Sequence, residues 1–328
     1  MPIRVGFLSV AHMHAWGYAA ALSADPGATC GPVWDPVPER AATFAQEFGL
    51  ETAASAEEVL AGCEAVLVMS ENKGHVELIE RAASAGRHVL CEKPLVTSEE
   101  EGRRVQSAAE CSSIKLMTAF PCRYSSAYQR LRERVTAGDI GSIRAICATN
   151  RGRCPFDWFV DVELSGGGAM IDHVVHVADL LRVLLGEEVA TVHAATGNNM
   201  YGETWEDTAM LTLTFPSGIF ASLDSSWSRP KSYRTWGDVT LNVVGEGGVI
   251  ELDMFAQAVE HYGVGDPAHN SLGYGSGMDA PLIADFLRCI AEDTEPPITL
   301  RDGLQAARVA LAGYESARSG QPVAVAAP

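Results

Sequence analysis

The chain has 328 residues, 47% hydrophobic and 20% charged, which is a globular composition with enough apolar material for a sizeable core. Its formal net charge is −18. Such a field repels nucleic acid and anionic membranes, so we expect a small neutral or polar molecule as the partner. No apolar stretch reaches the ~18 residues that span a bilayer, and Met1 leads into an apolar run without a basic leader.

The eight cysteines are scattered and show no C-x-x-C spacing. Cys63, Cys91 and Cys147 lie in apolar runs, where we expect burial. This usage favours reduced thiols over a disulfide framework and predicts a cytoplasmic protein.

Residues 1–122 alternate between apolar runs and helical patterns. The apolar runs lack in–out alternation, which is typical of a parallel sheet covered on both faces. Helices are expected between them and after the last, at Met13–Ser23, Pro38–Phe48, His75–Ala85, Ser98–Cys111 and Ser125–Ala137. The expected strands are Ile3–Ser9, Ala28–Asp35, Glu64–Ser70, His88–Cys91 and Ile114–Phe120.

Residues 123–328 have a different sequence pattern, in which long segments of alternating apolar and polar residues, typical of strands, are separated by turn signals. We expect an open, mostly antiparallel sheet with helices on one face, and a homodimer or homotetramer formed through this sheet. An irregular stretch, Arg151–Ser165, precedes a helix at Gly168–Leu185. Two late helices, Asp279–Glu292 and Asp302–Arg318, close the chain. The expected strands are Ser142–Thr149, Thr191–Thr196, Thr208–Phe215, Ile219–Trp227, Thr240–Val244 and Val249–Leu252.

The first strand runs into Ser9-Val10-Ala11-His12-Met13-His14, where a dinucleotide fold carries G-x-G-x-x-G. Each glycine is substituted, and we expect the Ala11 methyl to crowd a pyrophosphate by roughly an ångström or more. Asp35 ends the second strand, where a carboxylate accepts hydrogen bonds from ribose hydroxyls and repels a 2′-phosphate. This favours NAD over NADP. Asp35 is also a plausible turn residue before Pro36.

Polar residues follow the next two strands. Ser70, Asn72 and His75 come after the third, and Glu92-Lys93-Pro94 after the fourth. Both groups fall at the carboxyl edge of the sheet, where open α/β proteins bind ligands. A lysine there can be tuned by burial for proton transfer.

The segment Gly166-Gly167-Gly168 opens a helix that carries Asp172, His173 and His176. Asp172 and His176 are four residues apart and share one helical face. A carboxylate beside an imidazole fixes its tautomer and raises its basicity, which suits removal of a hydroxyl proton. We expect the three glycines to leave room for a substrate. A polar helix face without chemistry is the alternative.

These motifs together resemble the Gfo/Idh/MocA family, the relatives of glucose–fructose oxidoreductase and inositol dehydrogenase. Two further matches are Ser70–His75, similar to T-P-N-x-x-H, and Phe120–Tyr124, similar to an arginine-aromatic segment. The resemblance runs over nearly the whole chain. It implies a Rossmann domain (1–122) and a substrate-binding and oligomerisation domain (123–328) whose late helices pack back on the first. It also implies NAD(P)-dependent oxidation of a sugar, inositol or related polyol.

The resemblance implies roles for individual residues. Lys93 would be the catalytic lysine, His176 the acid/base, and Asp172 the residue that orients substrate or histidine, with a cis Lys93–Pro94 bond beside the nicotinamide. The cofactor set would be Ser9, Ala11, His12, Met13, Asp35, Ser70, Asn72, His75, Glu92, Lys93 and Pro94. The candidate substrate contacts are Arg123, Tyr124, Trp158, Phe159 and His173. Trp227 is expected in the core or an interface.

Two other functions stay open. His12, His14, His173 and His176 with Asp172 are residue types that bind a divalent metal, which would make a metal-assisted lyase or hydrolase. A non-catalytic binding protein on the same scaffold is the third possibility.

Overall fold

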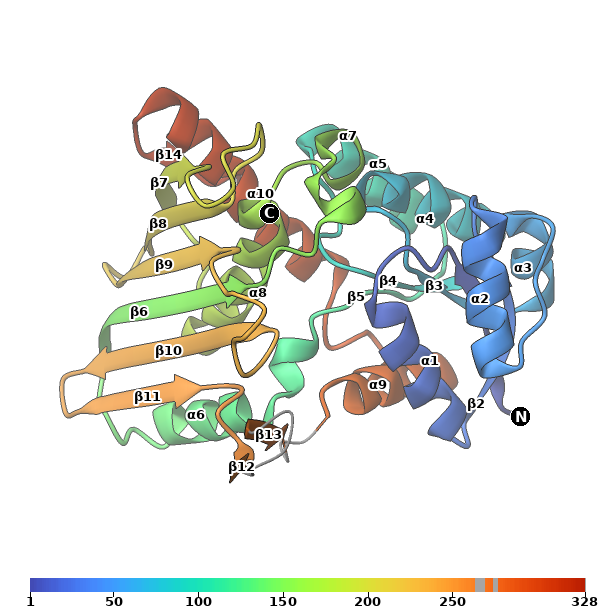
Figure 1. The fold of residues 1–328 in the computed structure, drawn as a ribbon, viewed down its shortest axis with the longest axis horizontal. Helices are drawn as coiled ribbons and strands as arrows, with labels where there is room; N and C mark the ends of the chain where they lie inside the picture. Colours follow the sequence, from blue (N-terminus) through green and yellow to red (C-terminus); the bar gives the residue numbers. More distant parts are fainter. Residues whose placement is uncertain (263–268, 274–276, 328) are drawn as a thin grey trace.

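The computed structural model describes residues 1–262, 269–273 and 277–327. Its N-terminal unit is a five-stranded parallel sheet of strand order β2-β1-β3-β4-β5 (Figure 1). The strands are β1 (Ile3–Leu8), β2 (Ala28–Trp34), β3 (Ala65–Val68), β4 (His88–Cys91) and β5 (Leu116–Thr118). The helices are α1 (His14–Ala24), α2 (Pro38–Phe48), α3 (Ala56–Gly62), η1 (Asn72–Gly74), α4 (His75–Ser84) and α5 (Glu99–Glu110).

The continuous apolar runs explain why this sheet is covered on both faces. Successive side chains of a strand point to opposite faces. In β3, Leu67 packs into the core that includes α1 and α2 residues, whereas Val66 and Val68 pack into the core beside α3 and α4. The predicted parallel sheet with two helical layers is confirmed.

The second unit is a seven-stranded sheet of order β11-β10-β6-β9-β8-β7-β14. Its pairs are antiparallel except β6–β9, which run parallel, so the predicted mostly antiparallel sheet is confirmed. The strands are β6 (Ile143–Gly152), β7 (Thr191–Gly197), β8 (Thr208–Thr214), β9 (Phe220–Ser226), β10 (Gly237–Gly245), β11 (Val249–Asp253) and β14 (Val323–Ala324); β12 (Ala258–Tyr262) and β13 (His269–Gly273) form a separate hairpin. The helices are η2 (Pro121–Tyr124), α6 (Ser126–Thr136), η3 (Asp157–Val160), α7 (Val162–Ser165), α8 (Ala169–Leu185), α9 (Asp279–Ala291) and α10 (Leu300–Ser319).

The late helices connect the two units. Helix α9 packs against α1, and α10 packs against α8 and β7 while also reaching α5 and β5. Helix α10 begins at a capping box, in which Thr299 and Asp302 each satisfy the other's backbone N–H. The C-terminal segment thus holds the parallel sheet and α8 in fixed relation, which positions the site described below.

Several local expectations were wrong. Helices α3 and α7, the β12–β13 hairpin and the short β14 were not predicted, because these segments are too brief to establish a hydrophobic period. Cys147 is exposed rather than buried. It lies in β6, where the pattern alternates, and it points to the face of the sheet away from α8.

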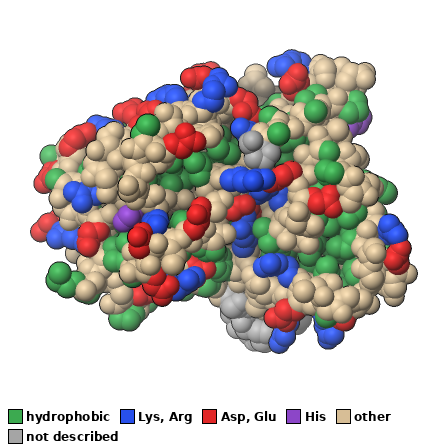
Figure 2. All heavy atoms as spheres, turned by 180° about the vertical axis from the view of Figure 1, so that it is seen from behind, with side chains coloured by type: hydrophobic (Ala, Val, Ile, Leu, Met, Phe, Trp, Pro, Cys, Tyr) green, Lys and Arg blue, Asp and Glu red, His purple; other side chains and the backbone are tan. Residues whose placement is uncertain are grey.

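The surface is mixed in charge. On the face opposite to that of Figure 1, acidic and basic side chains are interspersed (Figure 2). Among the helices in the described part of the chain, none combines the length and the apolar composition needed to cross a membrane.

Candidate active site

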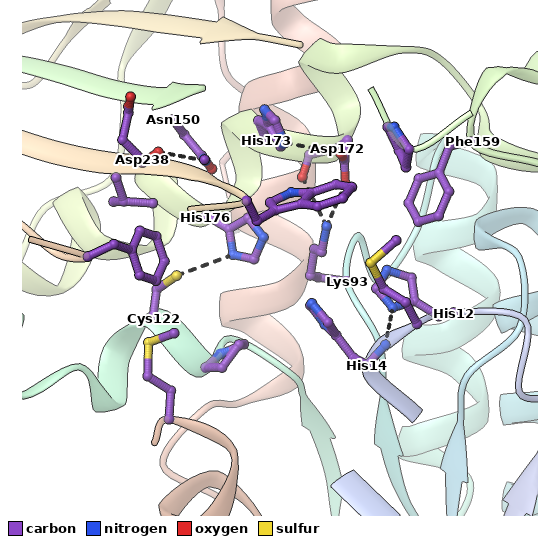
Figure 3. Close-up of a pocket in the computed structure, with 18 residues that line it drawn as sticks. His12, His14, Lys93, Cys122, Asn150, Phe159, Asp172, His173, His176 and Asp238 are labelled. Atoms are coloured by element: carbon purple, nitrogen blue, oxygen red, sulfur yellow. Dashed lines mark hydrogen bonds and ion pairs between the residues drawn. The ribbon is translucent and has the colours of Figure 1, made fainter. Parts of the chain in front are cut away.

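A cavity of about 130 Å³ lies where the carboxyl edge of the parallel sheet meets α8 (Figure 3). The loop after β1 and the segment after β4 form one side, and α8, η2, β6 and β10 contribute to the other. This is the edge at which open α/β sheets bind ligands. Of the residues that the sequence singled out, the cavity is lined by His12, Met13, His14, Lys93, Phe159, Asp172, His173 and His176.

Lys93 and Asp172 form a buried ion pair between the two units. Lys93 Nζ lies 2.6 Å from Asp172 Oδ1 and 3.2 Å from the Asp172 backbone oxygen. The other carboxylate oxygen accepts a 3.1 Å hydrogen bond from Trp227 Nε1 and lies 3.2 Å from His173 Nε2. Burial opposes ionisation, but Lys93 and His173 hold the pKa of Asp172 well below its usual range. Asp172 is therefore a carboxylate at neutral pH. The Lys93–Pro94 bond is cis, as the resemblance implied.

The glycines before α8 allow its first turn to dock. A Cβ on Gly167 would lie 2.0 Å from the Tyr314 hydroxyl oxygen, and one on Gly168 would lie 2.1 Å from the Glu206 backbone oxygen. Tyr314 in turn donates a 2.6 Å hydrogen bond to Glu206. The space at these two glycines is thus filled by protein, and the expectation that they make room for a substrate was wrong.

His176 lines the same cavity as Lys93 but does not pair with Asp172. Its Nδ1 lies 3.9 Å from the Cys122 sulfur. Burial and the nearby Lys93 charge lower the pKa of His176 well below its usual range, so the imidazole is neutral at pH 7. Burial raises the pKa of Cys122 to about 12, so its sulfur is a thiol. The predicted Asp172–His176 pair was wrong, because the Lys93 ammonium competes successfully for the carboxylate.

The loop after β1 has the backbone conformation that glycine favours, although Ser9 occupies its first glycine position. Ser9 has φ +65°, a left-handed conformation that a non-glycine residue seldom takes. Its hydroxyl donates to Asp35 Oδ2 at 2.8 Å, and the Val10 N–H donates to the same oxygen. Ala11 is half-buried, and its carbonyl accepts a 3.2 Å hydrogen bond from Trp158 Nε1. The loop is thereby anchored to the second unit.

Asp35 has more protein partners than the sequence suggested. Its Oδ1 accepts from the Val37 N–H at 2.7 Å and from Arg40 Nε at 2.9 Å. Arg40 also donates to Glu71 at 2.8 Å. Two carboxylates therefore surround one guanidinium, and the local charge at the end of β2 stays negative. This negative charge would repel the 2′-phosphate of NADP, whereas it would not repel the uncharged ribose hydroxyls of NAD.

The remaining predicted cofactor residues are not among those that line the cavity. His75 is fully buried, and its ring nitrogens lie 2.9 Å from the Pro94 carbonyl and 3.3 Å from the Ser70 carbonyl. The contact with Pro94 holds the Lys93–Pro94 segment in place. Asn72 donates to the Ser165 carbonyl at 2.8 Å. These contacts argue for supporting roles at His75 and Asn72 rather than for direct cofactor contact.

The predicted substrate contacts divide into two groups. Phe159 lines the cavity, and Trp158 stacks on it with ring centroids 3.8 Å apart. Arg123 instead pairs with Asp179, with its Nε 2.6 Å from Oδ2, and Tyr124 donates to Asp285. The geometry argues against substrate contact by Arg123 and Tyr124, because both side chains are engaged elsewhere.

Trp227 was assigned to the core, where it lies, and its indole also donates to Asp172, although Trp227 does not line the cavity. Some residues that do line it escaped sequence reasoning. Asn150 could have been found from its inward position at the end of an alternating strand, whereas residues from separate loops carry no such signal. The others are Pro121, Cys122, Pro155, Gly237, Asp238, Val239, Phe255 and Met278.

The metal set proposed from sequence does not assemble. His173 adjoins Asp172, whereas His12 and His14 adjoin Glu92. Figure 3 shows the two histidine pairs on different sides of the cavity. A lyase or hydrolase built on all five residues is not supported.

A parallel Rossmann sheet whose carboxyl edge presents a lysine, and faces a helix that carries Asp172 and His176, fits a nicotinamide-dependent oxidoreductase acting on CH–OH groups. Comparison with known sequences agrees. Residues 5–120 match the model described as the oxidoreductase family with NAD-binding Rossmann fold, and residues 128–251 match the GFO/IDH/MocA C-terminal domain. The chain belongs to the Gfo/Idh/MocA family, and its cofactor is NAD.

Individual relatives place the chain further. Myo-inositol dehydrogenase Hyg17 of Streptomyces leeuwenhoekii is 30% identical, over 88% of this chain and 90% of the relative. The scyllo-inositol 2-dehydrogenase (NAD(+)) of Bacillus subtilis is 26% identical over 98% and 96% of the two chains. The crystal structure of a putative myo-inositol dehydrogenase from Sinorhizobium meliloti 1021 superposes with a TM-score of 0.84 at 25% identity, covering 99% of this chain and 100% of the other.

The residues at the sheet edge fit a bound NAD. Asp35 follows β2 and Lys93 follows β4, so both lie at the carboxyl edge of the parallel sheet, and Lys93 lines the cavity. Bound NAD would supply the hydride acceptor.

Proposed function

We propose that this protein oxidises a ring hydroxyl of an inositol or a related sugar-like polyol, with His176 as the proton acceptor and Lys93 as the group that stabilises charge on the substrate oxygen. The observation that carries the proposal is their convergence: an amine from the first unit and an imidazole from the second line one cavity. The likeness to inositol dehydrogenases supports the choice of substrate class.

Lys93 and His176 have different roles, because the first is positively charged and the second is neutral. Bound NAD⁺ would supply the acceptor for the hydride that leaves the carbinol carbon. Lys93, held against the Asp172 carboxylate, donates a hydrogen bond to the substrate oxygen and stabilises negative charge that develops on it. Neutral His176 accepts the hydroxyl proton as the carbonyl forms. In the reverse direction, His176 returns the proton to the oxygen.

Polar side chains in the cavity wall support a hydroxyl-rich substrate. Lys93, Asn150 and His176 offer donor and acceptor groups to substrate hydroxyls. Phe159, stacked on Trp158, offers an apolar wall for a ring face.

The test is a panel of inositols, aldoses and acyclic polyols assayed by NADH fluorescence, with NADP⁺ run in parallel. Lys93→Ala and His176→Ala should each lower kcat by about 10² or more on the best substrate. An Arg123→Lys variant, altered outside the cavity, should retain turnover within a few-fold. Near-normal turnover in both alanine variants would refute the assigned roles.

We also propose that residues 1–122 bind the cofactor, and that residues 123–328 form the substrate side and join two or four copies through the open sheet face. One apolar row crosses this face, because Phe220 pairs with Ala145, Ala145 with Val244, and Val244 with Val249. Phe220 and Val249 are 53% and 54% exposed. A second copy of the same row would cover them.

The eight free thiols support a cytoplasmic location.

Light scattering after size exclusion tests the assembly. Phe220→Asp should dissociate the oligomer at micromolar concentration because it places a charge in the buried row. Val37→Asp is the control, because Val37 is an exposed apolar residue (41%) on the first unit, and this variant should not dissociate the oligomer. A wild-type monomer would refute the proposal.

A further inference from the structure

A second chemical cluster adjoins the cavity on the side of the first unit. Within the part of the chain that the structure describes, His12, His14 and Glu92 are the residues whose ligand atoms come together as a set that could hold a metal, all within 4.8 Å of one another. They come from two separate segments, the loop after β1 and the end of β4. None of the three takes part in the proton transfer proposed above, although His12 and Glu92 belong to the expected cofactor set.

The spacing of the donor atoms suits one small ion. His14 Nδ1 lies 2.6 Å and His12 Nδ1 lies 4.0 Å from Glu92 Oε1. Ligands at about 2.0–2.2 Å in tetrahedral geometry around Zn²⁺ are separated by roughly 3.3 Å. The two distances to Glu92 bracket this value, so movements of about an ångström or less bring both to it.

The three residues are joined by hydrogen bonds that a metal ion would replace. His12 Nδ1 accepts from the His14 backbone N–H, and His14 Nδ1–H donates to Glu92 Oε1 at 2.6 Å. An ion at this position would displace the proton on His14 Nδ1 and take the lone pair of His12 Nδ1 from that N–H. The set then offers two imidazoles and one carboxylate.

A supporting shell and an entry path are also present. Glu92 is fully buried, with its Oε1 accepting from the Tyr18 hydroxyl at 3.3 Å and its Oε2 from the Lys93 backbone N–H at 3.0 Å. Such outer contacts orient a ligating carboxylate. The His14 side chain is 36% exposed and lines the cavity, so an ion can reach the cluster from solvent. Figure 3 shows His12 and His14 side by side at this wall.

We propose that His12, His14 and Glu92 form a binding site for one divalent transition-metal ion of the Zn²⁺ type, with its fourth position open to the cavity. Two imidazoles select such ions over Mg²⁺ and Ca²⁺, which prefer oxygen ligands. The ion links the loop after β1 to the end of β4. Part of the anchoring that glycine-mediated phosphate contacts give in other Rossmann loops is thereby supplied by metal coordination.

The test is metal titration of the full-length protein after removal of bound metal with a chelator. Wild type should bind one equivalent of Zn²⁺ or Co²⁺ and unfold at a higher temperature with it. His14→Gln and Glu92→Gln should each weaken binding by 10-fold or more, because each removes one of three ligands. His193→Gln, which alters an exposed histidine on β7, is the control and should bind as wild type does.

Two results would overturn the proposal. One is a wild-type protein that takes up no stoichiometric metal. The other is a His14→Gln protein, folded by circular dichroism, that binds as tightly as wild type. Because His14 is partly exposed, this variant is expected to fold, and a Mg²⁺ titration run alongside checks the ion preference. Lys93 and His176 are unchanged throughout, so neither result bears on the proposed oxidation.

Discussion

Because the Lys93–Asp172 pair is buried, the free energy of unfolding depends on the charges of these two side chains. Lys93→Met removes the ammonium and keeps the length of the side chain, which leaves the Asp172 carboxylate buried with only Trp227 and His173 beside it. Breaking a buried pair in this way costs about 3–5 kcal/mol. We therefore expect the free energy of unfolding at pH 7 to fall by that amount.

The pH dependence gives the sharper test. In wild type the pKa of Asp172 is lowered, so its stabilising contribution is present above the ordinary value of about 3.9 and is lost only as pH falls below it. Without Lys93, burial dominates and the pKa of Asp172 rises above its ordinary value. The folded variant then binds a proton that the unfolded chain releases. Its stability should fall, relative to wild type, by up to about 1.4 kcal/mol per pH unit as pH rises above 4.

The assay is urea unfolding at pH 5, 6, 7 and 8 for wild type, Lys93→Met, Asp172→Asn and the double variant. The double variant has no carboxylate at this position, so its difference from wild type should not change with pH. It should also be less destabilised than the two single changes added together. A pH-independent difference below about 1 kcal/mol between Lys93→Met and wild type would refute the reasoning.

Three further predictions follow from neighbouring contacts. Trp227→Phe removes the indole donor to Asp172 and should lower stability by about 1.5–3 kcal/mol, measured by urea unfolding; an unchanged midpoint would show that this bond contributes nothing. Ala11→Gly removes the methyl that we expect to crowd the pyrophosphate and should tighten NAD binding in calorimetry, whereas equal or weaker affinity would indicate a rearranged loop. Glu71→Gln removes one of the two carboxylates that hold Arg40 and should raise kcat/KM for NADP⁺ relative to NAD⁺ several-fold; an unaltered ratio would show that Arg40 does not govern this choice.

The order of elements and the identity of the site's chief residues could be predicted because they depend on local pattern. Runs such as Ala65–Val68 have no polar alternation and must be buried on both faces, which dictates a parallel sheet with helices on each side. Lys93 follows such a run, so its place at the ligand edge is a consequence of chain direction alone. Asp172 and His176 share a helical face for an equally local reason.

The hydrogen-bond partners of those residues could not be predicted from local sequence pattern. Helical spacing suggested that Asp172 serves His176, yet the carboxylate is bound by Lys93, 79 residues earlier, and by Trp227, 55 residues later. Which partner a buried carboxylate takes depends on the competing charges that the fold brings within hydrogen-bond distance. The sequence by itself determined the sheet, its ligand edge and the residues offered there. Only the tertiary structure decided that His12 and His14 meet Glu92 and not His173, because docking of distant segments sets the distances between charges.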